Sequence, residues 1–150
     1  MFSLKALWDA YETADFGSRD GSYAAVNLGN GSIIVVPSAM IEEAEEIEEL
    51  EAQLQEGSWL ELPNRQYLDL GVRLVFRFAD EFLSPEDTER VRNYFSRRGA
   101  FRNWKDLLAE RGLLKRWYRY EYEEGVAAFK EWLNENDIPF EDDLGEYRFD

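Results

Sequence analysis

The sequence predicts an α+β fold, with a small antiparallel sheet of about three strands packed against helices in the N-terminal half and a helical C-terminal half. Two observations lead to this prediction. Stretches with strand character, bounded by glycine and proline, occur before residue 63, and apolar residues at helical spacing follow from residue 67 onward. The 150 residues show no internal repeat and no clear domain boundary, so we expect a single domain over residues 1–150.

The N-terminal half begins with a predicted helix and a predicted hairpin. Ser3 is a suitable N-cap for a helix from residue 4. Its apolar residues recur every three or four positions: Leu4, Leu7, Trp8, Tyr11 and Ala14. Two strands are predicted within residues 23–36, with Asn30 and Gly31 in the turn because both residue types tolerate positive φ.

A Glu-rich helix over residues 38–57 and a strand within residues 58–63 are predicted to complete this half. In the second half, Ser84 is followed by Pro and two acids, a pattern typical of a helix start. Gly99 and Gly112 are predicted to end helices. Ion pairs one helical turn apart are predicted for Glu86 with Arg90, Arg102 with Asp106 and Arg119 with Glu123. The acidic tail, at about 141–150, is predicted to be mobile.

The composition restricts the possible chemistry. The chain has no cysteine and no histidine, which excludes disulfides, thiolate nucleophiles, His-based zinc sites and Ser-His-Asp triads. A carboxylate- or Mg²⁺-dependent hydrolase is left as an alternative. Asp80 and Glu81 are candidates for it, but adjacent helical residues point in different directions. We therefore expect a non-enzymatic protein, with no catalytic residues, no metal site and no cofactor.

The location is predicted from the absence of two kinds of segment. No apolar run approaches the roughly 18 residues that cross a bilayer. The first 15 residues carry acids and lack a small-residue cleavage pattern. We expect a cytoplasmic protein without a membrane partner.

The charges are unevenly distributed along the chain, whose formal net charge is −15 at pH 7. Residues 97–120 contain eight of the 17 Lys and Arg and only two acids, whereas residues 42–56 contain eight Glu and no cation. Cations and aromatic residues alternate in RRGAFRNWKD, residues 97–106. This pattern has two interpretations: phosphate contacts with base stacking, or a junction between helices whose aromatic residues belong to the core.

We favour the junction. The predicted core residues of this motif are Phe101, Trp104, Leu108, Trp117 and Tyr118. The candidate binding residues are the cations left on the outside, Arg98, Arg102, Lys105 and Arg116. The net negative charge opposes nucleic acid, so the predicted partner is another protein, bound through this basic and aromatic edge and the Glu-rich helix. Nucleic-acid binding through residues 97–120 is the alternative.

Residues 99–138 resemble an uncharacterised family of small bacterial proteins. The family shows G-A-F-R-x-[FW]-K-D, then G-L-x-x-x-W-Y, then an alanine followed by Trp and Leu or Cys. These elements are here residues 99–106, 112–118 and 128–133. Trp104 stands where Phe is common. The family has no assigned activity, so the resemblance implies an α+β fold with a helical C-terminal half and no catalytic residue.

Overall fold

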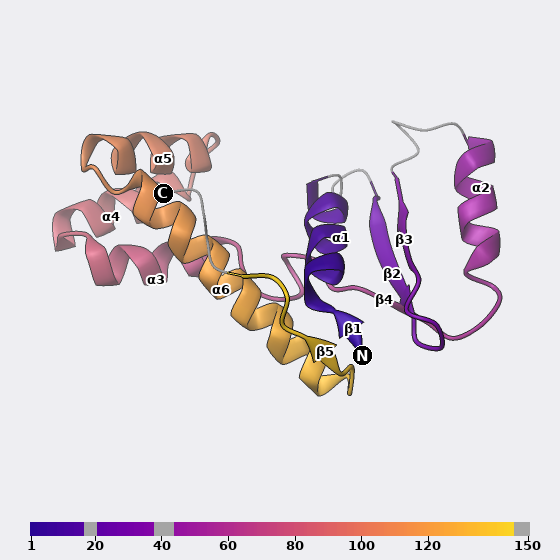
Figure 1. Ribbon diagram of the computed structural model, residues 1–150. Helices are drawn as coiled ribbons and strands as arrows, with labels where there is room; N and C mark the ends of the chain where they lie inside the picture. Colours follow the sequence, from indigo (N-terminus) through magenta and orange to yellow (C-terminus); the bar gives the residue numbers. More distant parts are fainter. Residues whose placement is uncertain (17–20, 38–43, 146–150) are drawn as a thin grey trace. The chain divides into compact units, whose positions relative to one another are not determined.

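The computed structural model describes residues 1–16, 21–37 and 44–145 (Figure 1). The predicted α+β class is confirmed, with an antiparallel sheet in the N-terminal half and helices in the C-terminal half. The chain forms two compact units, which we describe separately. The first contains the described residues of 1–68 and 128–145, and the second contains residues 69–127. Helix α6 (Leu114–Glu135) supplies residues to both units.

The first unit contains a three-stranded antiparallel sheet in the order β3-β2-β4. Its strands are β2 (Tyr23–Asn27), β3 (Ile33–Val36) and β4 (Trp59–Glu61). Helices α1 (Leu4–Phe16) and α2 (Ala44–Gln53) belong to the same unit. The predicted start of the Glu-rich helix, at residues 38–43, lies outside the described residues.

The hairpin turn differs in detail from the prediction. Gly31 has the positive φ of 79°, but Asn30 does not have a positive φ. Asn27 explains why. Its Oδ1 accepts hydrogen bonds from the backbone N–H groups of Gly29 and Asn30, at 2.8 and 3.1 Å. The backbone N–H of Asn27 donates to the carbonyl of Ser32 at 2.8 Å. The loop therefore has four residues, 28–31, and one left-handed glycine is sufficient to close it.

The core of the first unit combines α1, the sheet and the C-terminal part of α6. Fully or almost fully buried side chains come from all three: Leu4, Leu7, Trp8, Tyr11, Val26, Val36, Phe129 and Leu133. The Phe129 ring lies 5.6 Å from Trp8 and 5.2 Å from Tyr11, between ring centroids. Burial is the main cause that raises the pKa of Tyr11 to about 12. These rings join the two ends of the sequence in one core.

A second sheet joins the two ends as well, and the sequence did not predict it. Strands β1 (Phe2–Ser3) and β5 (Phe140–Glu141) pair in parallel, with Phe2 opposite Phe140. The predicted mobile tail therefore begins with paired residues. Its last five residues, 146–150, lie outside the described residues.

The second unit contains α3 (Val72–Phe82), α4 (Pro85–Tyr94), α5 (Ala100–Glu110) and the first part of α6 (Figure 1). Its core is aromatic: Phe78, Trp104 and Trp117 lie edge to face, with ring centroids 5.4 to 5.8 Å apart. Helix α3 begins later than the apolar pattern from residue 67 suggests. Asp69 has a left-handed φ of 58°, which a right-handed α-helix cannot accommodate. None of the described helices has the length and apolar character needed to span a membrane.

Candidate recognition surface

Of the predicted binding residues, Arg98 lies in the connection from α4 to α5, Arg102 and Lys105 lie in α5, and Arg116 lies in α6. The backbone N–H and the hydroxyl of Ser96 both donate to the carbonyl of Asn93, at 3.3 and 2.7 Å. Gly99 precedes α5 with a left-handed φ of 75°, which favours glycine. Hydrogen bonds and one glycine therefore fix the connection that carries Arg97 and Arg98.

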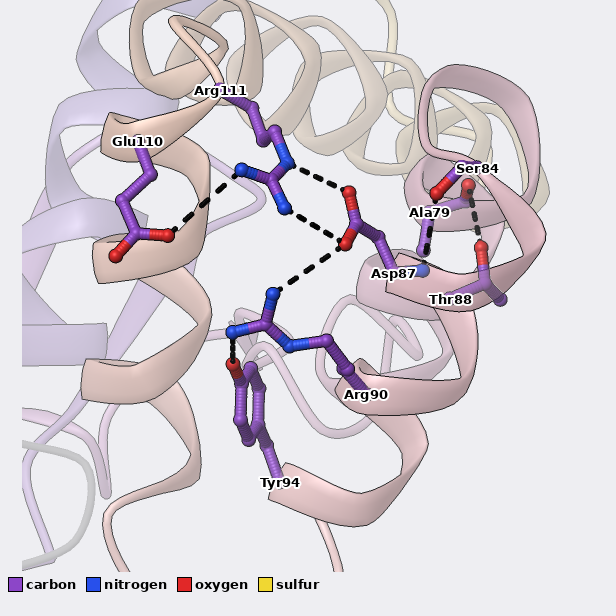
Figure 2. Close-up of polar contacts among 8 residues, drawn as sticks. All are labelled: Ala79, Ser84, Asp87, Thr88, Arg90, Tyr94, Glu110 and Arg111. Atoms are coloured by element: carbon purple, nitrogen blue, oxygen red, sulfur yellow. Dashed lines mark hydrogen bonds and ion pairs between the residues drawn. The ribbon is translucent and has the colours of Figure 1, made fainter.

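A charged cluster links α4 to the end of α5 (Figure 2). Asp87 is the one charged residue found in the buried class among the described residues. Its two carboxylate oxygens accept hydrogen bonds from Arg111, at 2.8 and 3.1 Å. Arg90 lies on the other side, with Nη1 3.6 Å from Asp87 Oδ1 and Nη2 donating to the Tyr94 hydroxyl at 3.1 Å. The Asp87 backbone N–H donates to the N-cap oxygen of Ser84 at 3.2 Å.

This cluster has the charge arrangement of a structural ion pair. The hydrogen bonds from Arg111 are the main cause that lowers the pKa of Asp87 below its usual range. Asp87 lies in the first turn of α4 and Arg111 caps the end of α5, so each charge also complements a helix dipole.

Three cations of this region lie at the wrong end of a helix for such an interaction. Arg102 is the third residue of α5, and Lys115 and Arg116 are the second and third residues of α6. Cations at helix N-termini oppose the dipole, so these three do not serve helix stability.

Two of the predicted binding residues lie against aromatic rings. The guanidinium of Arg116 is centred 4.4 Å from the ring centroid of Phe82, and Lys105 Nζ lies 5.7 Å from that of Tyr118. Arg116 also lines a surface hollow of about 560 Å³ formed by α6 and Phe82. Basic and aromatic side chains thus do meet on the surface, at two separate contacts.

A second hollow, of about 420 Å³, lies between α4 and α5 and includes Arg98. We call it the α4–α5 hollow; its lining residues are Arg90, Asn93, Tyr94, Arg97, Arg98 and Asn103. The four predicted binding residues therefore do not line a single hollow. Arg98 lines this hollow, Arg116 lines the other, and Arg102 and Lys105 line neither.

Most residues of the α4–α5 hollow were missed by the sequence analysis. Arg90 and Tyr94 are four residues apart, which places them on one face of α4, whereas Arg97 lies beyond the end of that helix. That spacing is the signal that could have found Arg90 and Tyr94.

Several cations of this region have no carboxylate or hydrogen-bond partner among the described residues. Within the part of the chain that the structure describes, no carboxylate or hydrogen-bond acceptor pairs with the charged groups of six of them: Arg97, Arg98, Arg102, Lys105, Lys115 and Arg116. The predicted pair of Arg102 with Asp106 is therefore wrong. The predicted pair of Arg119 with Glu123 is present at 3.0 Å.

The pair predicted for Glu86 with Arg90 is also wrong, since Arg90 lies beside Asp87. Asp87 is nearer because it is the residue that the Ser84 cap and Arg111 hold at the α4–α5 contact. Spacing along one helix did not reveal this competition between partners.

The aromatic residues of the motif divide into two groups. Trp104, Leu108 and Trp117 have exposed fractions of 0, 0 and 2 %, as expected of core residues. Phe101 and Tyr118 are 42 and 37 % exposed, so their prediction as core residues is wrong. The rings of Phe101 and Phe95 lie edge to face, with their centroids 5.0 Å apart. Both indoles are thus covered and unable to stack on bases.

The other candidate surface is the Glu-rich helix. The described Glu side chains of α2 are exposed: Glu45, Glu46, Glu48, Glu49 and Glu51. Across the described residues, no group of three or more acids has the geometry to hold a metal ion. Asp142 and Asp143, acids of the tail, bind Lys130 and the start of α1 respectively.

The chain matches no family model and no curated protein, and no solved structure matches it. The geometry described above is therefore what bears on function.

Proposed function

We propose that this protein is a non-catalytic recognition or regulatory module of the bacterial cytoplasm that binds an acidic surface of another protein. The contact is made by the basic edge of the second unit: Arg97, Arg98, Arg102, Lys105, Lys115 and Arg116. The Glu-rich helix offers a second face to a basic partner. Membership of the small bacterial family that residues 99–138 resemble is part of this proposal.

One observation supports the proposal above the others. The chain has 32 acids for 17 cations, so a cation can readily be given a carboxylate partner. Arg111 has one, in a bidentate pair with Asp87. The six cations of the basic edge have none among the described residues, and three of them oppose a helix dipole. An acidic partner relieves this unfavourable arrangement and provides specificity through charge complementarity.

Affinity capture tests the proposal. The wild-type chain, the double variant Arg102→Glu with Lys105→Glu, and the control Arg73→Glu with Arg77→Glu are used as bait in a bacterial lysate. The control makes the same change in net charge at α3 cations that are already paired, with Asp69 and Glu124. We expect the first variant, and not the control, to lose a set of acidic proteins, and we expect salt to weaken the wild-type capture of the same proteins.

The same experiment separates the nucleic-acid alternative. Treating the lysate with nucleases leaves a protein contact intact and abolishes capture through RNA or DNA. Capture that both double variants retain, or that nucleases remove, contradicts the proposal.

A further inference from the structure

The α4–α5 hollow is lined entirely by side chains that can donate or accept hydrogen bonds. Its six lining residues provide three guanidinium groups, two carboxamides and a phenol, and no carboxylate. A hollow of about 420 Å³ is large enough for a small anion and the group that carries it. In a chain with a net charge of −15, this concentration of donors without an acid requires an explanation.

One guanidinium of the hollow is held in place before any ligand arrives. Arg90 donates to the Tyr94 hydroxyl at 3.1 Å and lies 3.6 Å from Asp87 on its other side (Figure 2). Asp87 is itself fixed by its two bonds to Arg111. Arg90 therefore has a defined position, which lowers the entropic cost of using it to bind an anion.

The other two guanidiniums are available. Arg97 and Arg98 have no ion pair or hydrogen bond from their charged groups to any described residue. They are carried by the short connection that Ser96 and Gly99 shape. The backbone N–H of Arg97 donates to the carbonyl of Tyr94 at 3.1 Å. The backbone is thus fixed where these two side chains leave it.

The neighbouring Asp87 shows what one carboxylate needs in this environment. A single bidentate arginine satisfies it, with a second guanidinium at 3.6 Å. Three guanidiniums and two carboxamides exceed this requirement. They match a phosphate monoester, which carries about −1.5 to −2 charges at pH 7 and three strong acceptor oxygens. A phosphodiester of a nucleic acid carries one negative charge and suits the hollow less well.

We propose that the α4–α5 hollow binds the phosphate of a phosphorylated serine or threonine in the partner protein. This inference rests on the proposed function, which makes the partner a protein. The indoles of Trp104 and Trp117, the nearest in sequence, are buried and cannot stack on a base, so a nucleotide would have only the Tyr94 ring of the hollow. Arg97, Arg98 and Arg90 bind the phosphate oxygens, and the carboxamides of Asn93 and Asn103 add donors.

Fluorescence anisotropy with the full chain tests the proposal. The probe is a fluorescein-labelled Gly-Ala-phosphoserine-Ala-Gly peptide, compared with the same peptide carrying Ser or Glu. We expect the phosphorylated peptide to bind at least about tenfold more tightly than either. Binding should weaken severalfold from pH 7.5 to 5.5, because the second phosphate pKa is about 6.

The site is tested with Arg97→Gln and Arg98→Gln, against Arg92→Gln as the matched control. Arg92 lies on α4, lines a different hollow and undergoes the same charge change. Each hollow variant should weaken binding of the phosphopeptide at least about fivefold, and the control should leave it unchanged. Circular dichroism shows whether each variant is folded. The amide signals of Asn93 and Asn103 side chains should shift on titration in a heteronuclear NMR spectrum.

Several results would overturn the inference. They are equal binding of the three peptides, equal loss in the control, and a response of the NMR signals to inorganic phosphate but not to the phosphopeptide. Tighter binding of a single-stranded 12-nucleotide DNA than of the phosphopeptide would also do so. If the peptides fail while capture still depends on Arg102 and Lys105, the proposed function stands and this inference is wrong. If the phosphopeptide binds but the substitutions at Arg102 and Lys105 do not reduce capture, the hollow binds the phosphate and the proposed role of these two cations is wrong.

Discussion

At the scale of single residues, Trp104 combines complete burial with an unsatisfied polar atom. It has no exposed surface, and its Nε1 has no hydrogen-bond partner among the described residues. The ring is held at right angles by Phe78 and Trp117. An unpaired buried donor opposes stability by about 1–3 kcal/mol, so the ring is retained here for its apolar area.

This predicts different outcomes for two substitutions. Trp104→Ala should reduce the free energy of unfolding by about 3–5 kcal/mol, because it leaves a large cavity. Trp104→Phe should reduce it by less than about 1.5 kcal/mol, because it loses area but also removes the unpaired donor. Urea denaturation measures both, with Phe101→Ala as a half-exposed control. Equal losses for Ala and Phe at position 104 would contradict this account.

Asp87 makes stability depend on pH. Its pKa is lowered in the folded protein, so it stabilises the fold above its unfolded pKa of about 3.9, and this contribution is lost as the pH falls through the folded pKa. Asp87→Asn should lower the free energy of unfolding by about 1–2 kcal/mol at pH 7 and by much less at pH 3. Glu86→Gln, one residue earlier with no such pair, is the control. A loss for Asp87→Asn that does not change with pH would show that its packing matters and its charge does not.

At the scale of elements, α1 has an unusual N-terminus made from both ends of the sequence. The Ser3 hydroxyl accepts the N–H of Ala6 at 3.1 Å, as an N-cap does. Asp143, 138 residues further along the chain, accepts the N–H of Lys5 at 2.8 Å and a hydrogen bond from the Ser3 hydroxyl. These bonds lower the pKa of Asp143, with the one from Ser3 as the main cause.

Hydrogen exchange can separate these two caps. Asp143→Asn should accelerate exchange of the Lys5 amide severalfold more than that of the Ala6 amide, which Ser3 still accepts. Asp142→Asn removes only the ion pair with Lys130 and should leave both amides protected. In the wild type, the protection of Lys5 should be lost on acidification as the pH falls through the lowered pKa of Asp143, which then becomes protonated. Equal acceleration in the two variants would assign the effect to the tail as a whole.

The elements also show which features of the fold can be predicted from the sequence. Strands β2, β3 and β4 were predicted because β-branched runs, a glycine turn and Pro63 are local signals. The pairing of β1 with β5 was not, because two-residue strands have no periodicity and their partners lie at opposite ends of the chain. The cap from Asp143 is missed for the same reason: no local pattern encodes it.

The candidate site follows the same division. The outward position of Arg98, Arg102 and Lys105 followed from the spacing of the buried residues around them. The α4–α5 hollow did not, because it depends on how two helices meet through Gly99, with its φ of 75°. The prediction of Phe101 as a core residue was wrong because helical spacing indicates which way a side chain points. It does not indicate how completely neighbouring elements cover that side chain.

At the scale of the whole molecule, α6 is the element shared by the two compact units. Its residues 114–127 belong to the helical unit and residues 128–135 to the unit that contains the sheet. Trp117 and Phe129, one from each part, are both central to their own core. The single domain that the sequence suggests stays a prediction. Calorimetry tests it, because one cooperative transition over both cores requires their unfolding to be coupled.

Because the chain has a large net negative charge, we expect salt to stabilise the fold and to weaken binding to an acidic partner. With 32 acids and 17 cations, the folded chain repels itself. Raising NaCl from about 20 to about 300 mM shortens the screening length from roughly 20 to roughly 6 Å. It should therefore raise the melting temperature by a few degrees, while it weakens binding to an acidic partner. Replacing Glu45, Glu48 and Glu49 of α2 by Gln should reduce the effect of salt on melting, because these exposed carboxylates crowd one helix. A melting temperature that falls with salt would mean that attractive pairs such as Asp87 with Arg111 outweigh the repulsion, and the basic edge would then be one charged region among several balanced ones.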